Sequence, residues 1–404
     1  MRKKIKKAAL ILSLFIGFTT LLLLSSCTRE NRDGDWHAVT KKEGTVTTIT
    51  NPQDPKYGEI TFDLVQDLNI GSEDDENYLF YRVAGINVDG KENIYALDAG
   101  NCRVQKFDKD GKYLQTIGRK GQGPGEFANP WAFFIGADNT LYVSDQMKIE
   151  VFDAAGEHKK SIPLETRIYD FFVTPDDQII TYTILSEDGG NKKAIIKLDT
   201  EGKTIATVAE FTDVRAVQSN TAGRGTMTFK AYHQYNYWPY LCPSDSDGFE
   251  YAYPIEYKLF KMKSDGELSL VIEKDVAPNL ISSEEKKFIK DNIRGLTEKR
   301  GIQISDEVLE TACQFPPHRP FFNRILLDNA GRTYVRNARS VLDRNAGTQM
   351  DIFSRDGYYL YRASFPFAPD LIHAGYVYDV FTSDETGTVE IKRYRVKNWD
   401  QMEK

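Results

Sequence analysis

The sequence of 404 residues contains few of the residues that most often carry catalysis or hold a metal. It has four cysteines and five histidines. The cysteines are widely spaced, so they indicate neither a disulfide framework nor a C-x-x-C metal pair. The H-E-x-x-H and G-x-S-x-G motifs of metalloproteases and serine hydrolases are absent. We therefore expect Cys102, Cys242 and Cys313 to be buried single thiols.

The chain also lacks an excess of positive charge. Lysine and arginine number 52 against 59 aspartate and glutamate residues, which gives a net charge of −7 at pH 7. Five positive charges and no negative ones lie in residues 1–26, so removal of this segment would give −12. An acidic surface repels nucleic acid and anionic lipid headgroups. We therefore expect no nucleic-acid partner.

The N-terminal segment is typical of an export signal. It combines a basic start, an apolar run from Ala8 to Leu24 and small residues before Cys27. An apolar run of about 17 residues is at the short end of what spans a bilayer, so a membrane-spanning anchor is the alternative. Leu24-Ser25-Ser26-Cys27 resembles the lipobox of bacterial lipoproteins, in which the cysteine is acylated and becomes the first residue.

The lipobox resemblance implies that residues 1–26 are a signal peptide and that acylated Cys27 anchors the protein to a membrane. Several acyl chains on one cysteine hold a protein stably without any spanning helix. Residues 27–56 are polar, contain glycine and proline, and show little periodicity. We predict that they form a flexible tether.

A phrase of strands and turns recurs along the rest of the chain. It is seen as GINVDGKENIYALD then VQKFDKDG, as FFIGADNTLYVSD then IEVFDAAG, as FFVTPDDQIITYT then AIIKLDTEG, and less regularly as FEYAYPIEYKLFKMKSDG and as RILLDNAGRTYVR then MDIFSRDG. The glycines that end these phrases are 45, 46, 64 and 91 residues apart: Gly111, Gly156, Gly202, Gly266 and Gly357. A four-stranded propeller blade needs about 40 to 50 residues, so the repeat predicts five blades.

A helical insertion explains the longest of these intervals, at residues 281–313. Ser282 begins a capping-box pattern with Glu285, and apolar residues recur on one helical face as far as Leu296. Gly301 follows as a stop, and a second short helix is expected from Ser305.

A sixth blade would join the two ends of the chain. It would combine YVYDVFTSDETGTVEIKRYRVKN near the C-terminus with ITFDLVQDL, residues 60–68. A closing blade shared in this way locks a ring of sheets and leaves only short edges. The predicted fold is all-β, a six-bladed β-propeller of four-stranded antiparallel blades over residues 57–398.

The lipobox, the NIYALD-type strands and the GQGPGEF stretch between the first two blades together resemble a known family. They are similar to the six-bladed β-propeller lipoproteins of Gram-negative bacteria, which are related to NHL repeats. The resemblance covers residues 58–398 and implies the fold and a lipid-anchored place in the cell envelope, at the outer membrane. It implies no particular activity. The glycine-rich stretch lacks the helix start and the Lys-Ser/Thr of a phosphate loop, so we interpret it as a crossover between blades.

The two faces of the predicted disc differ. Because strands alternate in direction, the short a–b and c–d turns share one face, and the long b–c and d–a loops share the other. The loop-rich face collects our candidate ligand-binding residues, Glu126, Trp131, Arg167, Tyr169, Tyr235, Tyr237, Trp238, His318, Arg319 and Arg324, with His373 as a further candidate. Aromatic rings suit sugars and peptides, and arginines suit carboxylate or phosphate. Alternatively, the rings pack on the helical insertion and the arginines pair between blades.

These observations favour a binding or scaffolding module without catalytic residues or a resident cofactor. Its partners would be the membrane, through Cys27, and an envelope glycan, peptide or protein. Two enzymatic alternatives stay open. The first is a calcium-dependent lactonase or esterase with the metal in the central channel, for which Glu126, Asn129, Asp170 and Asn323 offer oxygen ligands. The second is a zinc lyase that uses His233, His318 and His373. A structural protein that contacts partners through blade edges is the third alternative.

The calcium alternative predicts a metal-dependent stability. A chelator should lower the melting temperature, and Asp170→Ala and Asn323→Ala should each abolish calcium binding, because a channel metal would join several blades. Thermal melting with Ca²⁺ and with chelator measures this effect. Identical melting under both conditions would remove the alternative.

Overall fold

The computed structural model describes residues 29–33, 36–187, 190–212, 219–221, 226–228, 235, 237–244, 248–313, 315–343 and 346–402. The predicted signal peptide, the lipidation site Cys27 and the zinc candidate His233 lie outside this part of the chain. Within it, neither helix has the length and apolar composition needed to cross a membrane.

Six antiparallel sheets form the blades, and their innermost strands contact one another in chain order around a closed ring. Blade 1 contains β6 (Val83–Val88), β7 (Ile94–Asp98), β8 (Arg103–Phe107) and β9 (Tyr113–Ile117). Blade 2 contains β12 (Pro130–Ile135), β13 (Leu141–Asp145), β14 (Lys148–Phe152) and β15 (His158–Pro163). Blade 3 contains β16 (Ile168–Val173), β17 (Ile179–Glu187), β18 (Gly190–Leu198) and β19 (Thr204–Thr212).

The remaining blades include strands from the N-terminal part of the chain. Blade 4 contains β22 (Tyr240–Pro243), β23 (Phe249–Ala252), β24 (Lys258–Met262) and β25 (Leu268–Lys274). Blade 5 contains β26 (Phe322–Leu327), β27 (Thr333–Asn337), β28 (Thr348–Phe353) and β29 (Tyr359–Phe365), with β4 (Glu59–Thr61) added in parallel. Blade 6 contains β30 (Leu371–His373), β31 (Tyr376–Thr382), β32 (Val389–Val396) and, as its outer strand, β5 (Leu64–Ile70). The predicted six-bladed propeller with a shared closing blade is confirmed.

The predicted flexible tether is wrong from Trp36 onward. A hairpin of β2 (Trp36–Glu43) and β3 (Val46–Asn51) extends blade 4, because β3 pairs in parallel with β25; β1 (Arg29–Asp33) pairs with β2. The Trp36 indole donates to the carbonyl of Asp54 and packs edge-on against Tyr358. This hairpin carries no copy of the blade repeat, so the repeat pattern gave no signal for it.

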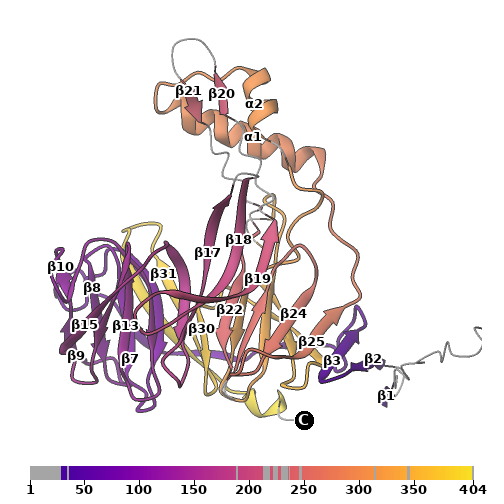
Figure 1. Ribbon diagram of the computed structural model, residues 1–404, viewed down its shortest axis with the longest axis horizontal. Helices are drawn as coiled ribbons and strands as arrows, with labels where there is room; N and C mark the ends of the chain where they lie inside the picture. Colours follow the sequence, from indigo (N-terminus) through magenta and orange to yellow (C-terminus); the bar gives the residue numbers. More distant parts are fainter. Residues whose placement is uncertain are drawn as a thin grey trace, which may run out of the picture.

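The helical insertion is confirmed and stands beyond one face of the disc. Helix α1 (Ser283–Glu298) has the predicted capping box between Ser282 and Glu285, and α2 (Asp306–Ala312) is capped by Ser305. Figure 1 shows both helices and the β20 (Ser219–Thr221) and β21 (Thr226–Thr228) pair above the projecting ends of β17 and β18. The loop-rich face is therefore the face that carries the insertion.

The apolar core lies between blades rather than within them. Six clusters each combine side chains of two neighbouring blades, including the pair formed by blades 6 and 1. The three described cysteines are buried and unpaired with one another, which confirms their prediction as single thiols.

Asn51 provides a test of the docked hairpin. Its fully buried amide donates to the carbonyls of Glu273 in blade 4 and Gly357 in blade 5, and accepts from the N–H of Tyr359. Asn51→Ala leaves these groups unsatisfied and should cost about 3 kcal/mol of unfolding free energy, measured by chemical denaturation. Thr47→Ala, on the same strand, serves as the control and should change it by less than about 0.5 kcal/mol. An unchanged Asn51→Ala protein would contradict a docked hairpin.

Candidate functional site

The loop-rich end of the channel is shaped by β-bulges in the innermost strands. The pairing register shifts by one residue near the start of β6, β12, β16 and β26. The bulged positions include Trp131, Tyr169-Asp170 and Asn323. A bulge bends a strand and re-aims its side chains, and bulges are frequent beside binding sites. Four of the six inner strands are therefore distorted at the same level of the channel.

A cavity of ≈ 420 Å³ occupies the channel at this level and below it. Inner strands of several blades contribute to its wall, which includes Phe134, Asp170, Tyr240, Arg324 and Asp370. Several of these groups are charged or polar although the cavity lies at the centre of the molecule. Mixed polar and apolar walls of this kind are typical of small-ligand sites.

Arg324 is the centre of this polar group. Its guanidinium is solvent-accessible and makes no hydrogen bond or ion pair with any described residue. Asp170 and Asp370 both interact with it electrostatically, as do Tyr182 and Tyr240. We call Arg324, Asp170, Asp370, Tyr182 and Tyr240 the Arg324 cluster. Five N–H donors of an arginine left without protein acceptors can serve a ligand.

Burial raises the pKa of the carboxyl groups around Arg324. Loss of solvent around Asp170 and Asp370 raises their pKa values, and the positive charge of Arg324 opposes this rise only in part. Asp170 nevertheless has solvent-accessible surface, because it faces the channel cavity. Asp379 of the same blade is also affected, because burial together with the charge of Asp370 raises its pKa to about 6. Perturbed carboxyl groups in a cavity are a recognised mark of functional sites.

The predicted aromatic surface is brought together, but its ring faces are covered. The Arg167 guanidinium lies 4.4 Å from the ring centre of Trp131 and 5.4 Å from that of Tyr169. Tyr169 stacks on Tyr182 at 5.5 Å, and Trp238 packs against both tyrosines. These rings therefore form a wall beside the Arg324 cluster rather than an open stacking platform.

Four other predicted ligand-binding residues lie near the helical insertion, and two of them, Tyr235 and Arg319, attach it to the propeller. The Tyr235 hydroxyl donates to the Glu285 carboxylate of α1, and Arg319 forms an ion pair with the same group at 3.4 Å. The Tyr237 hydroxyl donates to the carbonyl of His318. This arrangement matches the alternative that the aromatic residues of this segment pack against the insertion.

The GQGPGEF loop is stabilised by contacts among residues 119–127. Glu126 accepts from the N–H of Gly123 and pairs with Arg119 at 2.9 Å, while short strands β10 (Arg119–Lys120) and β11 (Glu126–Phe127) pair in parallel. Gly118 has φ +74°, and a Cβ there would lie 2.2 Å from the ring of Phe127. The interpretation as a crossover fits this geometry, and Glu126 faces its own loop.

The four calcium candidates do not share one set of contacts. The Glu126 carboxylate is held by Arg119, and the Asn323 amide oxygen accepts from Arg336 at 2.8 Å. Asn129 is an exposed loop residue whose N–H donates to Asp145. Among the described residues, no group of three or more His, Cys, Asp and Glu is placed to hold a metal ion. The calcium alternative receives no support from this arrangement.

Sequence reasoning found part of the Arg324 cluster and missed the rest. Arg324 and Asp170 were candidates, whereas Asp370, Tyr182 and Tyr240 were not, because no motif marks them and only ring closure places blade 6 across the channel from blade 3. His373 was expected on the loop-rich face. It ends β30 beside an a–b turn and therefore lies on the opposite, short-turn face.

The fold is a six-bladed β-propeller whose channel holds a cavity with polar and charged walls. The chain belongs to the family described as "Domain of unknown function (DUF4934)", whose model matches residues 73–314. A search of curated proteins finds no significant match. The lipoprotein and NHL-repeat parts of the resemblance stay predictions.

Three solved structures are similar to this chain. A protein of Bacteroides fragilis provisionally described as exported is 11% identical, with a TM-score of 0.52 over 87% of this chain and 99% of its own. A member of the duf4221 family from Bacteroides vulgatus is 10% identical, with a TM-score of 0.48 over 85% and 99%. Virginiamycin B lyase from Staphylococcus aureus is 8% identical, with a TM-score of 0.40 over 90% and 98%.

The attachment of the insertion should depend on acid pH through Glu285. Burial would raise the pKa of this carboxyl group, but hydrogen bonds from Tyr235, Ser340 and the Ser282 N–H outweigh burial and lower the pKa to about 2. A lowered folded-state pKa stabilises the protein fully above about pH 4.5, and this contribution of about 3 kcal/mol is lost as the pH falls towards 2. Melting temperatures between pH 2.5 and 6 should fall steeply for the wild type and less for Glu285→Gln.

The control for this experiment is Glu284→Gln, which changes an exposed neighbour in the same turn of α1. It should retain the acid dependence of the wild type. Equal acid dependence of wild type and Glu285→Gln would show that Glu285 does not hold the insertion.

Proposed function

We propose that this protein is a lipid-anchored binding module of the bacterial cell envelope that binds the hydroxyl groups of a glycan through the Arg324 cluster. The observation that carries the proposal is the free guanidinium of Arg324 in a channel cavity, beside two carboxyl groups and two phenols. Such a site offers hydrogen bonds in both directions within a small space.

The mixture of donors and acceptors favours a polyhydroxylated ligand over a simple anion. Arg324 can only donate, ionised Asp170 and Asp370 can only accept, and the phenols of Tyr182 and Tyr240 can do either. A sugar hydroxyl both donates and accepts, so neighbouring hydroxyls can bridge an arginine and an aspartate. A carboxylate or phosphate would satisfy Arg324 but, having no donors, would leave the acceptors of Asp170 and Asp370 unused.

The covered aromatic rings set the mode of binding. Arg167 and Tyr182 both pack on Tyr169, and Lys193 lies 4.3 Å from the ring centre of Trp238. A sugar ring would therefore enter the channel end-on and be held by hydrogen bonds rather than by stacking. This geometry suits the terminal residue of a glycan chain.

The envelope location rests on the lipobox at Cys27 and on the acidic charge of the chain after removal of residues 1–26. The B. fragilis protein of the same fold is provisionally described as exported, which agrees with export of this chain. Acylation would place the propeller at a membrane surface, where envelope glycans are present.

Removal of the Arg324 guanidinium should weaken glycan binding. A glycan array on the purified protein identifies the ligand, and isothermal titration then compares wild type with Arg324→Gln. Loss of a hydrogen bond to a charged group costs about 1.5–3 kcal/mol, so affinity should fall about 10- to 100-fold. Arg395→Gln, an exposed arginine on the outer part of blade 6, is the matched control and should bind normally. An array without any bound glycan, or equal affinity of both variants, would disprove the proposal.

Lipid anchoring can be tested independently of the ligand. Cys27→Ser should abolish labelling by an alkyne-tagged fatty acid and move the protein from the membrane fraction to the soluble envelope fraction, because the acyl chains provide the only proposed anchor. Cys102→Ser, which changes a buried thiol, should keep both label and location. Label retained by Cys27→Ser would contradict the lipobox assignment.

A further inference from the structure

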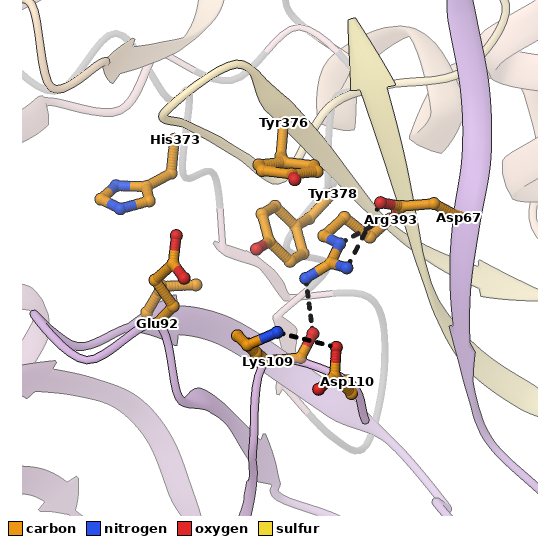
Figure 2. A pocket seen from close by; sticks show the side chains of 9 residues that line it. Asp67, Glu92, Lys109, Asp110, His373, Tyr376, Tyr378 and Arg393 are labelled. Atoms are coloured by element: carbon orange, nitrogen blue, oxygen red, sulfur yellow. Dashed lines mark hydrogen bonds and ion pairs between the residues drawn. The ribbon is translucent and has the colours of Figure 1, made fainter. Parts of the chain in front are cut away.

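A second pocket lies on the short-turn face and shares one lining residue, His373, with the channel cavity. It has a volume of ≈ 290 Å³ and lies where blade 6 closes against blade 1. Blade 1 contributes Glu92 from its a–b turn and Lys109 and Asp110 from its c–d turn, while blade 6 contributes His373, Tyr376, Tyr378, Arg393 and Asp67. Figure 2 shows the imidazole of His373 and the carboxylate of Glu92 directed towards one another across this space.

Glu92 departs from a rule that the other turns of this face obey. Nine turns in the described part of the chain share one pattern, in which the first residue donates to the carbonyl four residues later and the fourth residue donates back to the first. In all nine the fourth residue has a positive φ. It is glycine in six turns and Asn139 or Asp177 in two; in the ninth it is Glu92, at φ 64°.

This backbone conformation is unfavourable for glutamate. Glycine adopts it freely, and asparagine and aspartate tolerate it because their short polar side chains bond locally. A glutamate there destabilises the turn. No side-chain interaction offsets this effect, because the Glu92 carboxylate forms no hydrogen bond or ion pair with any described residue. Residues that break a local rule in this way are concentrated at functional sites.

No positive side chain of the pocket pairs with Glu92. Arg393 forms a two-pronged ion pair with Asp67 at 3.0 and 3.3 Å and donates to the carbonyl of Lys109, and the Lys109 ammonium pairs with Asp110 at 3.1 Å. Figure 2 shows these contacts together on the side of the pocket away from Glu92. The positive side chains are thus already partnered.

His373 adds a second open acceptor. Burial lowers the pKa of its imidazole, although the negative charges of Glu92 and Asp328 oppose this effect. A neutral imidazole presents one nitrogen that accepts a hydrogen bond. The ring forms no hydrogen bond with any described residue. The pocket therefore offers a carboxylate and an imidazole nitrogen to a ligand that is positively charged and rich in donors.

We propose that this pocket binds a small organic cation whose primary ammonium group lies between the Glu92 carboxylate and the His373 imidazole. The described residues supply no third His, Cys, Asp or Glu that would complete a metal site here, which favours an ammonium group over a metal ion. An ammonium group has three donors and no acceptor, which matches two open acceptors and the surrounding solvent. The site opens on the opposite face from Arg324, and His373 also lines the short-turn end of the channel cavity.

Three diffusible probes of one chain length test the ligand class on the purified protein. Isothermal titration should detect saturable binding of putrescine, at least tenfold weaker binding of 1,4-butanediol and no binding of succinate. Glu92→Gln keeps the length of the side chain and removes its charge, so it should weaken putrescine binding at least tenfold. Arg324→Gln should leave it unchanged. Absence of saturable putrescine binding, or equal binding by Glu92→Gln, would overturn the proposal.

The unfavourable backbone conformation of Glu92 allows a second test, in which loss of binding is accompanied by a gain in melting temperature. Glu92→Asn should lose putrescine binding and yet raise the melting temperature by about 1–2 °C, because asparagine tolerates the positive φ. The reciprocal change in blade 2, Asn139→Glu, places a glutamate at the matching position and should lower the melting temperature by a similar amount. A destabilised Glu92→Asn protein would show that Glu92 has a structural role, and would overturn the proposal as well.

Discussion

Closure of the ring is the constraint on which the rest of this structure depends. The outer strand of blade 6, β5, comes from residues 64–70, and it pairs with β32 at residues 389–396. Each of the six apolar clusters is shared by two neighbouring blades. A break at any one seam would expose two apolar faces and free the strands that line the channel. Closure brings together two distant parts of the chain, and the apolar contacts between blades offset its entropic cost.

Both candidate pockets are consequences of closure. The Arg324 cluster takes residues from blades 3, 4, 5 and 6, and the Glu92 pocket lies at the seam between blades 6 and 1. Neither site can exist in a partly closed chain, because no single blade supplies more than a few of its side chains. The bulges of the inner strands then re-aim residues such as Trp131 and Asp170 at the channel end without disturbing the packing between blades.

The polar groups that join blades and those of the two candidate sites differ in how many hydrogen-bond and ion-pair partners they have. Some buried groups that join neighbouring blades have several partners. Asp351, for example, is bound by Lys274, Tyr257 and Tyr359 between blades 4 and 5. Arg324 in the channel and Glu92 and His373 at the seam have no such partners among the described residues. Arg324 and Glu92 are exposed and His373 is half-buried, so their unused donors and acceptors are accessible to a ligand.

The sequence by itself determined the blade repeat, the number of blades, the helical insertion and its capping box, because these depend on local patterns: strand alternation, glycines at positive φ and the Ser282–Glu285 spacing. It also indicated Arg324 and Asp170 as candidates. Only the tertiary structure decided that residues 36–51 extend blade 4, that Tyr235 and Arg319 attach the insertion, and that Asp370 and Tyr182 meet Arg324. The physical reason is that these are contacts between segments far apart in the chain, which ring closure brings together and no local pattern encodes.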